Sequence, residues 1–221
     1  MANIWDKDIL IFAISTMREA MNKGVDFSEN RPINITAYNF MVSTNRAASG
    51  SNYERLKSGL ERMVGTTIST NIATDGQVTD DIFPLITKGK IVKSESTGKM
   101  EKVEITLCDW LFNAVVNTKE LLTINRDYFK LTSGLDRRLY EIARKHCGQQ
   151  ASWKISLELL HHKTGSQSPL KAFRQSMKKS ISANVLPDYH MTYNEKTDQV
   201  TFQQRDSKAV IASIINDSLG C

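Results

Sequence analysis

Residues 159–187 read LLHHKTGSQSPLKAFRQSMKKSISANVLP and contain no acidic side chain, although the chain as a whole holds 29 Lys and Arg against 24 Asp and Glu. Ser168 and Pro169 are typical of a helix N-cap and a first helical position. Apolar residues then recur at helical spacing, at Leu170, Phe173, Met177 and Ile181. This pattern predicts an amphipathic helix that packs by one face.

The opposite face of this helix carries amide and ammonium groups. At about 100° per residue, Gln175 and Lys179 lie directly opposite the apolar stripe, flanked by Lys171 and Lys178, while Arg174 lies near the apolar edge. Base edges in the DNA major groove offer hydrogen-bond patterns, and the flanking phosphates attract cations. We therefore predict that this is the main DNA-reading helix. The alternative is a solvated basic face on an ordinary surface helix.

Composition restricts the class of protein. A chain of 221 residues can form one large or two small domains, and its 40% apolar and 24% charged residues are ordinary for a globular protein. No apolar run approaches the length of a membrane span and the N-terminus does not resemble a secretion signal, so we expect a cytoplasmic protein without a membrane partner. The three cysteines are odd in number and widely spaced, which predicts neither a disulfide framework nor a zinc site.

Charge is distributed unevenly along the chain. The net charge is +6 from Leu121 onward and −1 over the first 120 residues. This asymmetry suggests that the second half binds a polyanion, without identifying it.

Sequence patterns in the first half of the chain predict helices followed by a long hairpin. We expect a helix capped by Asn3 or Asp6 and ending at Asn22–Gly24, then a strand entry and a short helix within Ile33–Met41. Ser51 and Glu54 fit a capping box for a helix that runs to Val64. β-Branched patterns predict further strands at Thr66–Ile72, Ile82–Val92 and Lys102–Leu107, a short helix at Cys108–Val116 and a strand at Leu121–Ile124. A winged helix-turn-helix is the natural proposal for this order.

Sequence patterns in the second half predict a similar order of helices and hairpin. We expect a helix capped by Ser133 and ended by Gly148, a shorter helix near Leu157–Lys163, and then the basic helix. A hairpin should follow, with arms at about Tyr189–Tyr193 and Val200–Gln204, and a last helix at Lys208–Ile215.

The two halves also match residue by residue. A shift of 117 places Leu170 on Tyr53, Phe173 on Leu56, Met177 on Leu60 and Ile181 on Val64. The same shift sets Lys171 against Glu54 and Lys178 against Glu61. We therefore hypothesise an internal duplication in which the second copy stayed basic. The first copy, with carboxylates on its DNA-facing side, is then the candidate for dimer contacts.

The chain resembles the replication initiator protein A group of plasmid initiators, which bind repeated origin sequences (iterons). The residues that carry the resemblance are WDKDIL at 5–10, YERLKSGLERMVGTTIST at 53–70, YFKLTSGLDRRLYEIA at 128–143 and the closing segment 171–179. The likeness extends from Ile4 to about Arg205.

This resemblance implies an α+β fold of two tandem winged-helix domains. We place the first at residues 1–120, for dimerisation and secondary DNA contact, and the second at residues 121–221, as the main sequence-reading domain. The resemblance further implies binding to double-stranded origin repeats, a homodimer that represses its own gene, a monomer that initiates, and contacts with the host initiator and replicative helicase.

Under this interpretation we assign DNA-binding roles to side chains of both halves. Base edges are assigned to Lys171, Gln175 and Lys178. Phosphates are assigned to Ser166, Ser168, Arg174 and Lys179, and Gln167 belongs to the same DNA-binding set. The corresponding candidates in the first half are Arg55, Lys57, Ser58 and Arg62. Lysines of the first hairpin could track a backbone, although such lysines also serve solubility and edge protection: Lys88, Lys90, Lys99 and Lys102.

The sequence gives little support for catalysis. It contains neither a phosphate-cradling glycine loop with lysine nor a glycine-rich dinucleotide turn, so we expect no enzyme, cofactor or metal. His161 and His162 are adjacent and lack the spacing of a metal pair. Strand opening would then depend on binding energy and partner proteins. The alternatives left open are a winged-helix transcriptional repressor without initiator activity and a protein-interaction module with a basic face.

Overall fold

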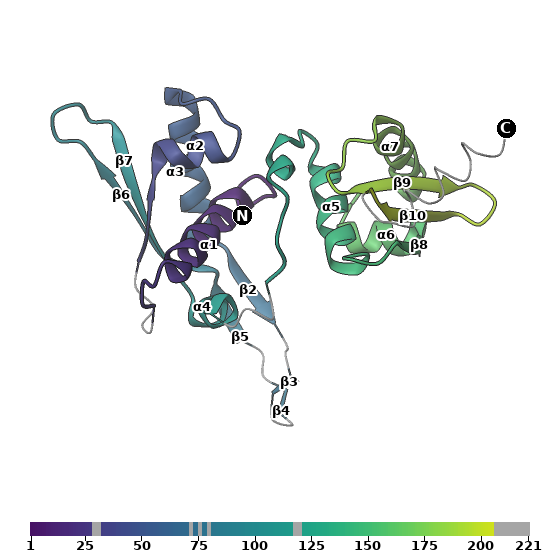
Figure 1. Ribbon diagram of the computed structural model, residues 1–221, viewed down its shortest axis with the longest axis horizontal. Helices are drawn as coiled ribbons and strands as arrows, with labels where there is room; N and C mark the ends of the chain where they lie inside the picture. The colour runs from purple at the N-terminus through teal and green to yellow at the C-terminus, as the bar shows by residue number, and fades with distance from the viewer. Residues whose placement is uncertain (28–31, 71–72, 75–76, 79–80, 117–120, 206–221) are drawn as a thin grey trace. The chain divides into compact units, whose positions relative to one another are not determined.

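The computed structural model describes residues 1–27, 32–70, 73–74, 77–78, 81–116 and 121–205. The chain divides into two compact units, Met1–Leu121 and Leu122–Cys221 (Figure 1). Both combine helices with small antiparallel sheets, which confirms the α+β class. Each unit is described by itself.

Unit 1 consists of helices packed against a three-stranded sheet, with two short strand pairs. Its elements are α1 (Lys7–Asn22), β1 (Ile33–Thr36), α2 (Ala37–Ser43), α3 (Gly50–Val64), β2 (Thr67–Thr70), β3 (Ala73–Thr74), β4 (Gln77–Val78), β5 (Asp81–Pro84), β6 (Ile86–Lys93), β7 (Met100–Leu107) and α4 (Asp109–Val116). The hairpin β6–β7 accepts β1 as its third strand, in the order β1-β7-β6. Two short antiparallel pairs, β2–β5 and β3–β4, lie between α3 and β6 in the sequence.

The core of unit 1 joins the helices to this sheet. Leu56 and Leu60 of α3 pack in one buried cluster with Met17 of α1, Phe40 of α2 and Ile105 of β7. The helical spacing of apolar residues in α3 predicted one apolar face, and in the structure that face packs on the core.

Two boundaries in unit 1 differ from the sequence-based expectations. The N-cap of α3 is Ser49, so Ser51 already belongs to the first helical turn and forms no capping box with Glu54. The expected strand Ile82–Val92 is two strands, because β5 pairs with β2 and β6 pairs with β7. Pro84, which has no N–H to donate, ends the first of them.

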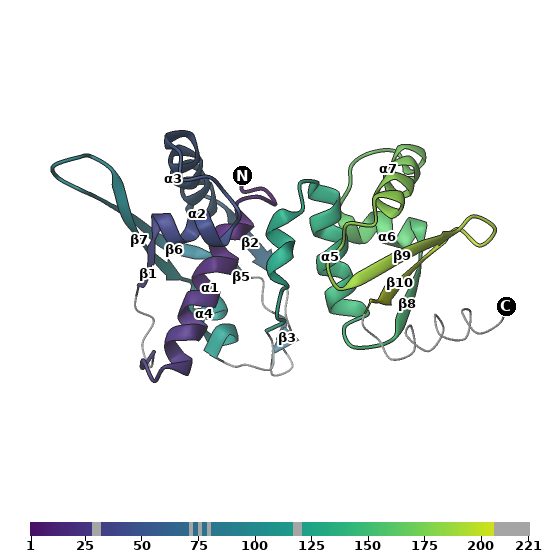
Figure 2. The same ribbon diagram turned by 45° about the horizontal axis from the view of Figure 1, so that its top comes forward.

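Unit 2 repeats the arrangement in a shorter form. Its elements are η2 (Arg126–Lys130), α5 (Gly134–His146), β8 (Ser152–Ser156), α6 (Leu157–Thr164), α7 (Leu170–Ala183), β9 (Tyr189–Asn194) and β10 (Gln199–Gln204). The sheet order is β8-β10-β9, all antiparallel. In both views α7 lies along one side of this unit, with the β9–β10 hairpin next to it (Figures 1 and 2).

Helix α5 begins and ends at the residues that the sequence predicted, and Ser156, which was not predicted as a cap, begins α6. The Ser133 side chain accepts a hydrogen bond from the backbone N–H of Asp136 at the start of α5. Gly148 follows that helix with a φ of +55°, a left-handed conformation that glycine adopts readily. The Ser156 side chain likewise caps α6 by accepting from the N–H of Leu159.

Other expectations for unit 2 were wrong or fall outside the described residues. Leu121–Ile124 is not a strand: the Thr123 carbonyl accepts from Arg144, and the Asn125 N–H donates to the Tyr140 hydroxyl, so side chains satisfy this backbone. The strand β8 was not predicted, because its alternating pattern is short. The expected helix Lys208–Ile215 lies outside the described residues.

Apart from the short strands β2 to β5 and helix α4 in unit 1 and η2 in unit 2, the two units share the order helix, strand, helix, helix, strand, strand, and they share one sheet order. The aligned helices also share their burial: Phe173 and Leu56 are buried, as are Met177 and Leu60. This agreement supports the internal duplication that the sequence comparison suggested. Among the helices of the described ranges, none is long and apolar enough to cross a membrane.

Candidate nucleic-acid interface

Helix α7 exposes one continuous polar face. Phe173, Met177 and Ser180 are buried on its inner side. The exposed residues on the other side are Lys171, Ala172, Gln175, Ser176, Lys178, Lys179, Ser182 and Ala183. None of the 14 residues of the helix is acidic. The face therefore offers ammonium and amide donors without a carboxylate of its own.

The segment before α7 differs from the prediction in one detail. The N-cap residue is Pro169, in an extended conformation, and the helix begins at Leu170. Ser168 therefore does not cap the helix; its hydroxyl lies 2.9 Å from that of Ser166, and both serines are half-buried. Gln167 between them is exposed.

The hairpin β9–β10 supplies carboxylates to one edge of α7. Arg174 donates to both oxygens of Asp198, from Nη2 to Oδ2 at 2.9 Å and from Nε to Oδ1 at 3.3 Å. Its Nε also lies 3.2 Å from the Tyr193 hydroxyl, which donates to Asp198. The sequence interpretation had placed Arg174 near the apolar edge, and the structure gives it a carboxylate partner within the unit.

Lys178 is paired one helical turn further on. Its ammonium group donates to the Glu195 carboxylate and lies 5.7 Å from the centre of the Tyr193 ring. The hydrogen bond from Lys178 lowers the pKa of Glu195, and the same bond raises the pKa of Lys178. Arg174, and then Tyr193, lower the pKa of Asp198 in the same way. These two carboxylates therefore stay ionised well below neutral pH.

Helix α3 of unit 1 presents a different outward face. Glu54 and Glu61 are exposed and Ser58 is half-exposed, at the positions that correspond to Lys171, Lys178 and Gln175. A face with two carboxylates repels DNA phosphates, so α3 differs from α7 in electrostatics although both helices pack in the same way.

The predicted cations of α3 lie on the flanks of that face. Lys57 is paired with Glu61 one turn away, at 3.9 Å. Arg62 donates to both oxygens of the buried Asp6 at 2.7 and 2.9 Å, and Asp6 raises the pKa of Arg62. Arg55 is exposed and donates weakly to the Asn52 side chain at 3.4 Å. Arg62 therefore anchors the start of α1 to α3.

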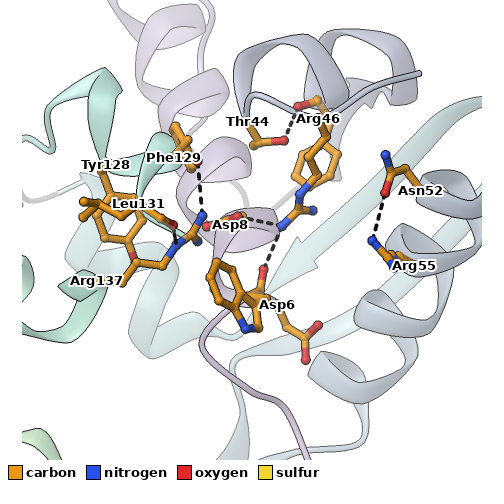
Figure 3. Close-up of polar contacts among 12 residues, drawn as sticks. Asp6, Asp8, Thr44, Arg46, Asn52, Arg55, Tyr128, Phe129, Leu131 and Arg137 are labelled. Carbon is orange, nitrogen blue, oxygen red and sulfur yellow. Dashed lines mark hydrogen bonds and ion pairs between the residues drawn. The ribbon is translucent and has the colours of Figure 1, made fainter. Parts of the chain in front are cut away.

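A pocket of about 430 Å³ lies beside α3 in unit 1, lined by Asn3, Trp5, Asp6, Ile9, Arg46, Asn52, Arg55 and Arg62. Of these lining residues, Arg46 forms an ion pair with Asp8: it donates to the fully buried Asp8 carboxylate at 2.7 Å (Figure 3). The sequence interpretation did not identify the pairing of Arg46 with Asp8, because 38 positions separate the two residues and no short motif joins them.

In unit 2, the segment LDRRLY also supplies a buried arginine. Arg137 donates to the carbonyls of Leu131 and Phe129, and its guanidinium lies 5.0 Å from the centre of the Tyr128 ring (Figure 3). These contacts fix η2 against α5. This part of the sequence therefore has a structural role in unit 2.

The lysines of the β6–β7 hairpin fall into two groups. Lys90 and Lys102 both contact Glu104, at 3.4 and 3.0 Å, and the pKa of Glu104 is lowered, first by Lys102. Lys88 and Lys99 are exposed. The exposed pair remains available for a polyanion.

In the described ranges the fold consists of two α+β units of similar element order, and helix α7 of the second exposes a basic, acid-free face. Residues 1–191 match the family model for replication initiator protein A. The chain therefore belongs to the replication initiator protein A family. It is 44% identical over 207 residues to a protein of Wigglesworthia glossinidia brevipalpis named "Putative replication protein", covering 92% of this chain and 74% of that one.

The fold is also similar to that of solved structures. A crystal structure of domains 2 and 3 of RctB superposes with a TM-score of 0.71 at 11% identity, covering 93% of this chain and 83% of that chain. A second RctB structure of these domains gives a TM-score of 0.63 at 12% identity. At such low identity the likeness concerns the fold alone.

Proposed function

We propose that the protein is a sequence-specific double-stranded DNA-binding initiator of plasmid replication, built from two tandem winged-helix domains. The acid-free outward face of α7 is the observation that carries this proposal. In each unit a helix is followed by a two-stranded hairpin of the kind that forms a wing. Membership of the initiator family supports origin repeats as the DNA that is bound.

Helix α7 reads the DNA sequence in this proposal. In this proposal Gln175, at the middle of the exposed face, and Lys171, beside it, meet base edges when the helix enters the major groove. Lys178 reads a base edge at the rim of the same face. The phosphate contacts come from Lys179 and from the segment before the helix, with Ser166, Gln167 and Ser168.

Unit 1 has a supporting role in DNA binding. In this proposal Arg55 and Lys57 contact phosphates from the flanks of α3, and Ser58 contacts one from its outward face. Because Arg62 is held by Asp6, its contribution to DNA binding is indirect, through the position of α3. The repulsion expected from Glu54 and Glu61 favours unit 1 as the domain for dimer contacts.

The wider initiator role is proposed on family membership. Binding to origin repeats opens the DNA through binding energy, without nucleotide hydrolysis, and the protein recruits the host initiator and replicative helicase. A homodimer represses the initiator gene in the cytoplasm, and a monomer initiates replication.

A binding titration tests the DNA-reading assignment. A cognate duplex is selected by the wild-type protein from a randomised pool, and its affinity is compared with that of a random duplex. The double variant Lys171→Ala with Gln175→Ala should lose this preference while its circular dichroism spectrum is unchanged. The control Lys154→Ala with Gln150→Ala removes the same residue types from exposed positions away from α7. Unchanged discrimination in the α7 variant would show that another surface reads the sequence.

A plasmid-maintenance experiment separates an initiator from a repressor. The gene and its flanking repeats are placed on a plasmid with no other initiator. Maintenance of this plasmid, and its loss with the α7 double variant, is expected for an initiator. A repressor would bind the repeats without maintaining the plasmid.

A further inference from the structure

Two carboxylates of the β9–β10 hairpin bind cations of α7, and the two ion pairs differ in strength. Arg174 makes two hydrogen bonds to Asp198 and a third to Tyr193. Lys178 makes one hydrogen bond, to Glu195. The Lys178 and Glu195 side chains are 48% and 70% exposed, so water and other anions reach this pair easily. A single exposed ion pair of this kind is readily exchanged.

The corresponding positions of unit 1 have a different arrangement. Lys57 corresponds to Arg174 and Glu61 to Lys178, and these two residues pair with each other along α3. Within the described residues, therefore, the helix-to-hairpin ion pairs distinguish the helix that we propose reads DNA from its counterpart in unit 1.

We infer that Glu195 lowers the DNA affinity of α7: its carboxylate competes with DNA for Lys178, and it holds Lys178 away from DNA phosphates until a cognate base edge replaces it. This inference rests on the proposed function of α7. On non-cognate DNA the Lys178–Glu195 pair stays closed, because phosphate contacts alone form such complexes. On cognate DNA the helix enters the groove fully, and a base acceptor takes the place of the Glu195 carboxylate.

Arg174 has a positioning role in this arrangement. Its bidentate bond to Asp198 fixes the hairpin turn beside α7, which keeps Glu195 within reach of Lys178. A carboxylate that competes for a DNA-binding cation lowers the affinity for DNA, because the ion pair must open before the cation can contact the DNA.

Glu195→Gln is the direct test, because it keeps the shape of the side chain and removes its charge. On a random duplex, we expect the variant to release one more counterion, so the logarithmic salt slope should steepen by about 0.9. The same relation corresponds to roughly tenfold tighter binding at about 50 mM salt. Cognate affinity should rise at least as much, because the wild-type protein must break the Lys178–Glu195 pair before Lys178 meets its base edge, whereas the variant has no such pair to break. The ratio of cognate to random affinity should therefore not fall.

Two further variants separate this effect from a general gain of positive charge. Glu158→Gln makes the same charge change at an exposed position at the start of α6, and it should leave the salt slope unchanged. The second variant adds Glu195→Gln to a protein that already carries Lys178→Ala. In that background Glu195→Gln should tighten random-duplex binding no more than Glu158→Gln does. Such a dependence of one substitution on the other shows that the two residues are coupled, as measured by a double-mutant cycle. Circular dichroism confirms that each variant is folded.

The outcomes distinguish the inference from the proposed function. If Glu195→Gln and Glu158→Gln behave alike, or if the gain persists without Lys178, the role of Glu195 is refuted while DNA binding by the wild type stands. If the wild-type protein binds no duplex at low salt, the proposed function itself is refuted.

Discussion

The backbone of Gly89 in β6 lies directly against the side chain of Leu60 in α3. A Cβ atom added at Gly89 would stand 2.8 Å from Cγ and Cδ2 of Leu60, closer than real Cβ contacts allow. Leu60 is 2% exposed and packs in the core of unit 1, so it has little room to move. This contact sets how closely α3 approaches the β6–β7 hairpin.

Gly89→Ala should therefore destabilise unit 1. Overpacking a core of this kind costs roughly 1–3 kcal/mol in the free energy of unfolding, which chemical denaturation can measure. Gly50→Ala is the matched control, since a Cβ there would meet nothing within 4 Å and Gly50 begins a helix. The control should be neutral or slightly stabilising. Equal stability of the two variants would contradict the close packing of α3 on β6.

Arg62→Ala should destabilise the protein more than Arg55→Ala. Arg62 binds both oxygens of Asp6, which is buried, so its removal leaves a carboxylate without its cation. Arg55 lies on the same helix and loses only a weak contact with Asn52. Thermal unfolding followed by circular dichroism compares the two melting temperatures. If Arg62 instead served mainly as a DNA contact, its variant would melt like the Arg55 variant.

The difference between these two arginines shows where sequence-based reasoning reaches its limit. Helical spacing correctly predicted the buried residues Leu56 and Leu60, because periodicity reports which face of a helix is apolar. It could not show that Arg62 faces Asp6, because 56 residues separate the two and only the tertiary fold brings them together.

The same limit applied to the candidate site on α7. The absence of acidic residues between positions 159 and 187 was visible in the sequence, and the structure exposes that face. The carboxylates Asp198 and Glu195 were expected only as parts of a turn. Their pairing with α7 depends on how the hairpin packs against the helix, which no local pattern encodes.

Strand boundaries were the least predictable part of the fold. The segment from Ile82 to Val92 reads as one β-branched run, yet its two parts pair with different strands. Pairing partners are set by distant residues, so composition alone could not divide the run. Similarly, β8 was missed although Trp153 and Ile155 alternate with polar residues, because five residues carry too weak a signal.

Asp198→Asn should weaken the helix-to-hairpin contact in a pH-dependent way. Arg174 depresses the pKa of Asp198 below its ordinary value of 3.8, so the ion pair contributes stability above that value and loses it as the pH falls through the lower, folded pKa. The melting temperature of the wild type should therefore exceed that of the variant by a constant amount above about pH 5, and this difference should shrink as the pH falls below 3.8.

The matched control for this experiment is Asp127→Asn. Asp127 pairs with Lys130 on an exposed turn of η2, at positions i and i+3, where an ion pair contributes little. The difference in melting temperature between Asp127→Asn and the wild type should be small at every pH. A gap for Asp198→Asn that does not narrow in acid would mean that the lost hydrogen bonds, and not the charge of Asp198, stabilise the hairpin.

Tyr140→Phe should destabilise unit 2 through one missing hydroxyl. That hydroxyl accepts from the Asn125 N–H and donates to Asp188, both at 2.9 Å, and the side chain is fully buried. Burial is the first cause that raises the pKa of Tyr140, so the group remains a neutral donor. Leaving these partners unsatisfied costs about 1–3 kcal/mol. Tyr38→Phe, at a tyrosine that is 61% exposed, should cost almost nothing in the same denaturation experiment.

A comparison of Lys171→Ala with Lys57→Ala tests the proposed division of labour between the two units. Both substitutions remove one positive charge from a helix of the duplicated arrangement. Lys171 lies on the exposed face of α7, whereas Lys57 lies on the flank of α3 and is paired with Glu61. Loss of a base-reading side chain should weaken cognate binding roughly five- to hundredfold and relax the sequence preference.

Loss of Lys57 should instead weaken cognate and random binding by the same small factor, as expected for a phosphate contact. Fluorescence anisotropy titrations with both duplexes measure the two ratios. If Lys57→Ala reduced the preference for cognate DNA as strongly as Lys171→Ala, α3 would also read sequence. That result would contradict the proposed division of labour, because Glu54 and Glu61 on the outward face of α3 would then lie against the DNA.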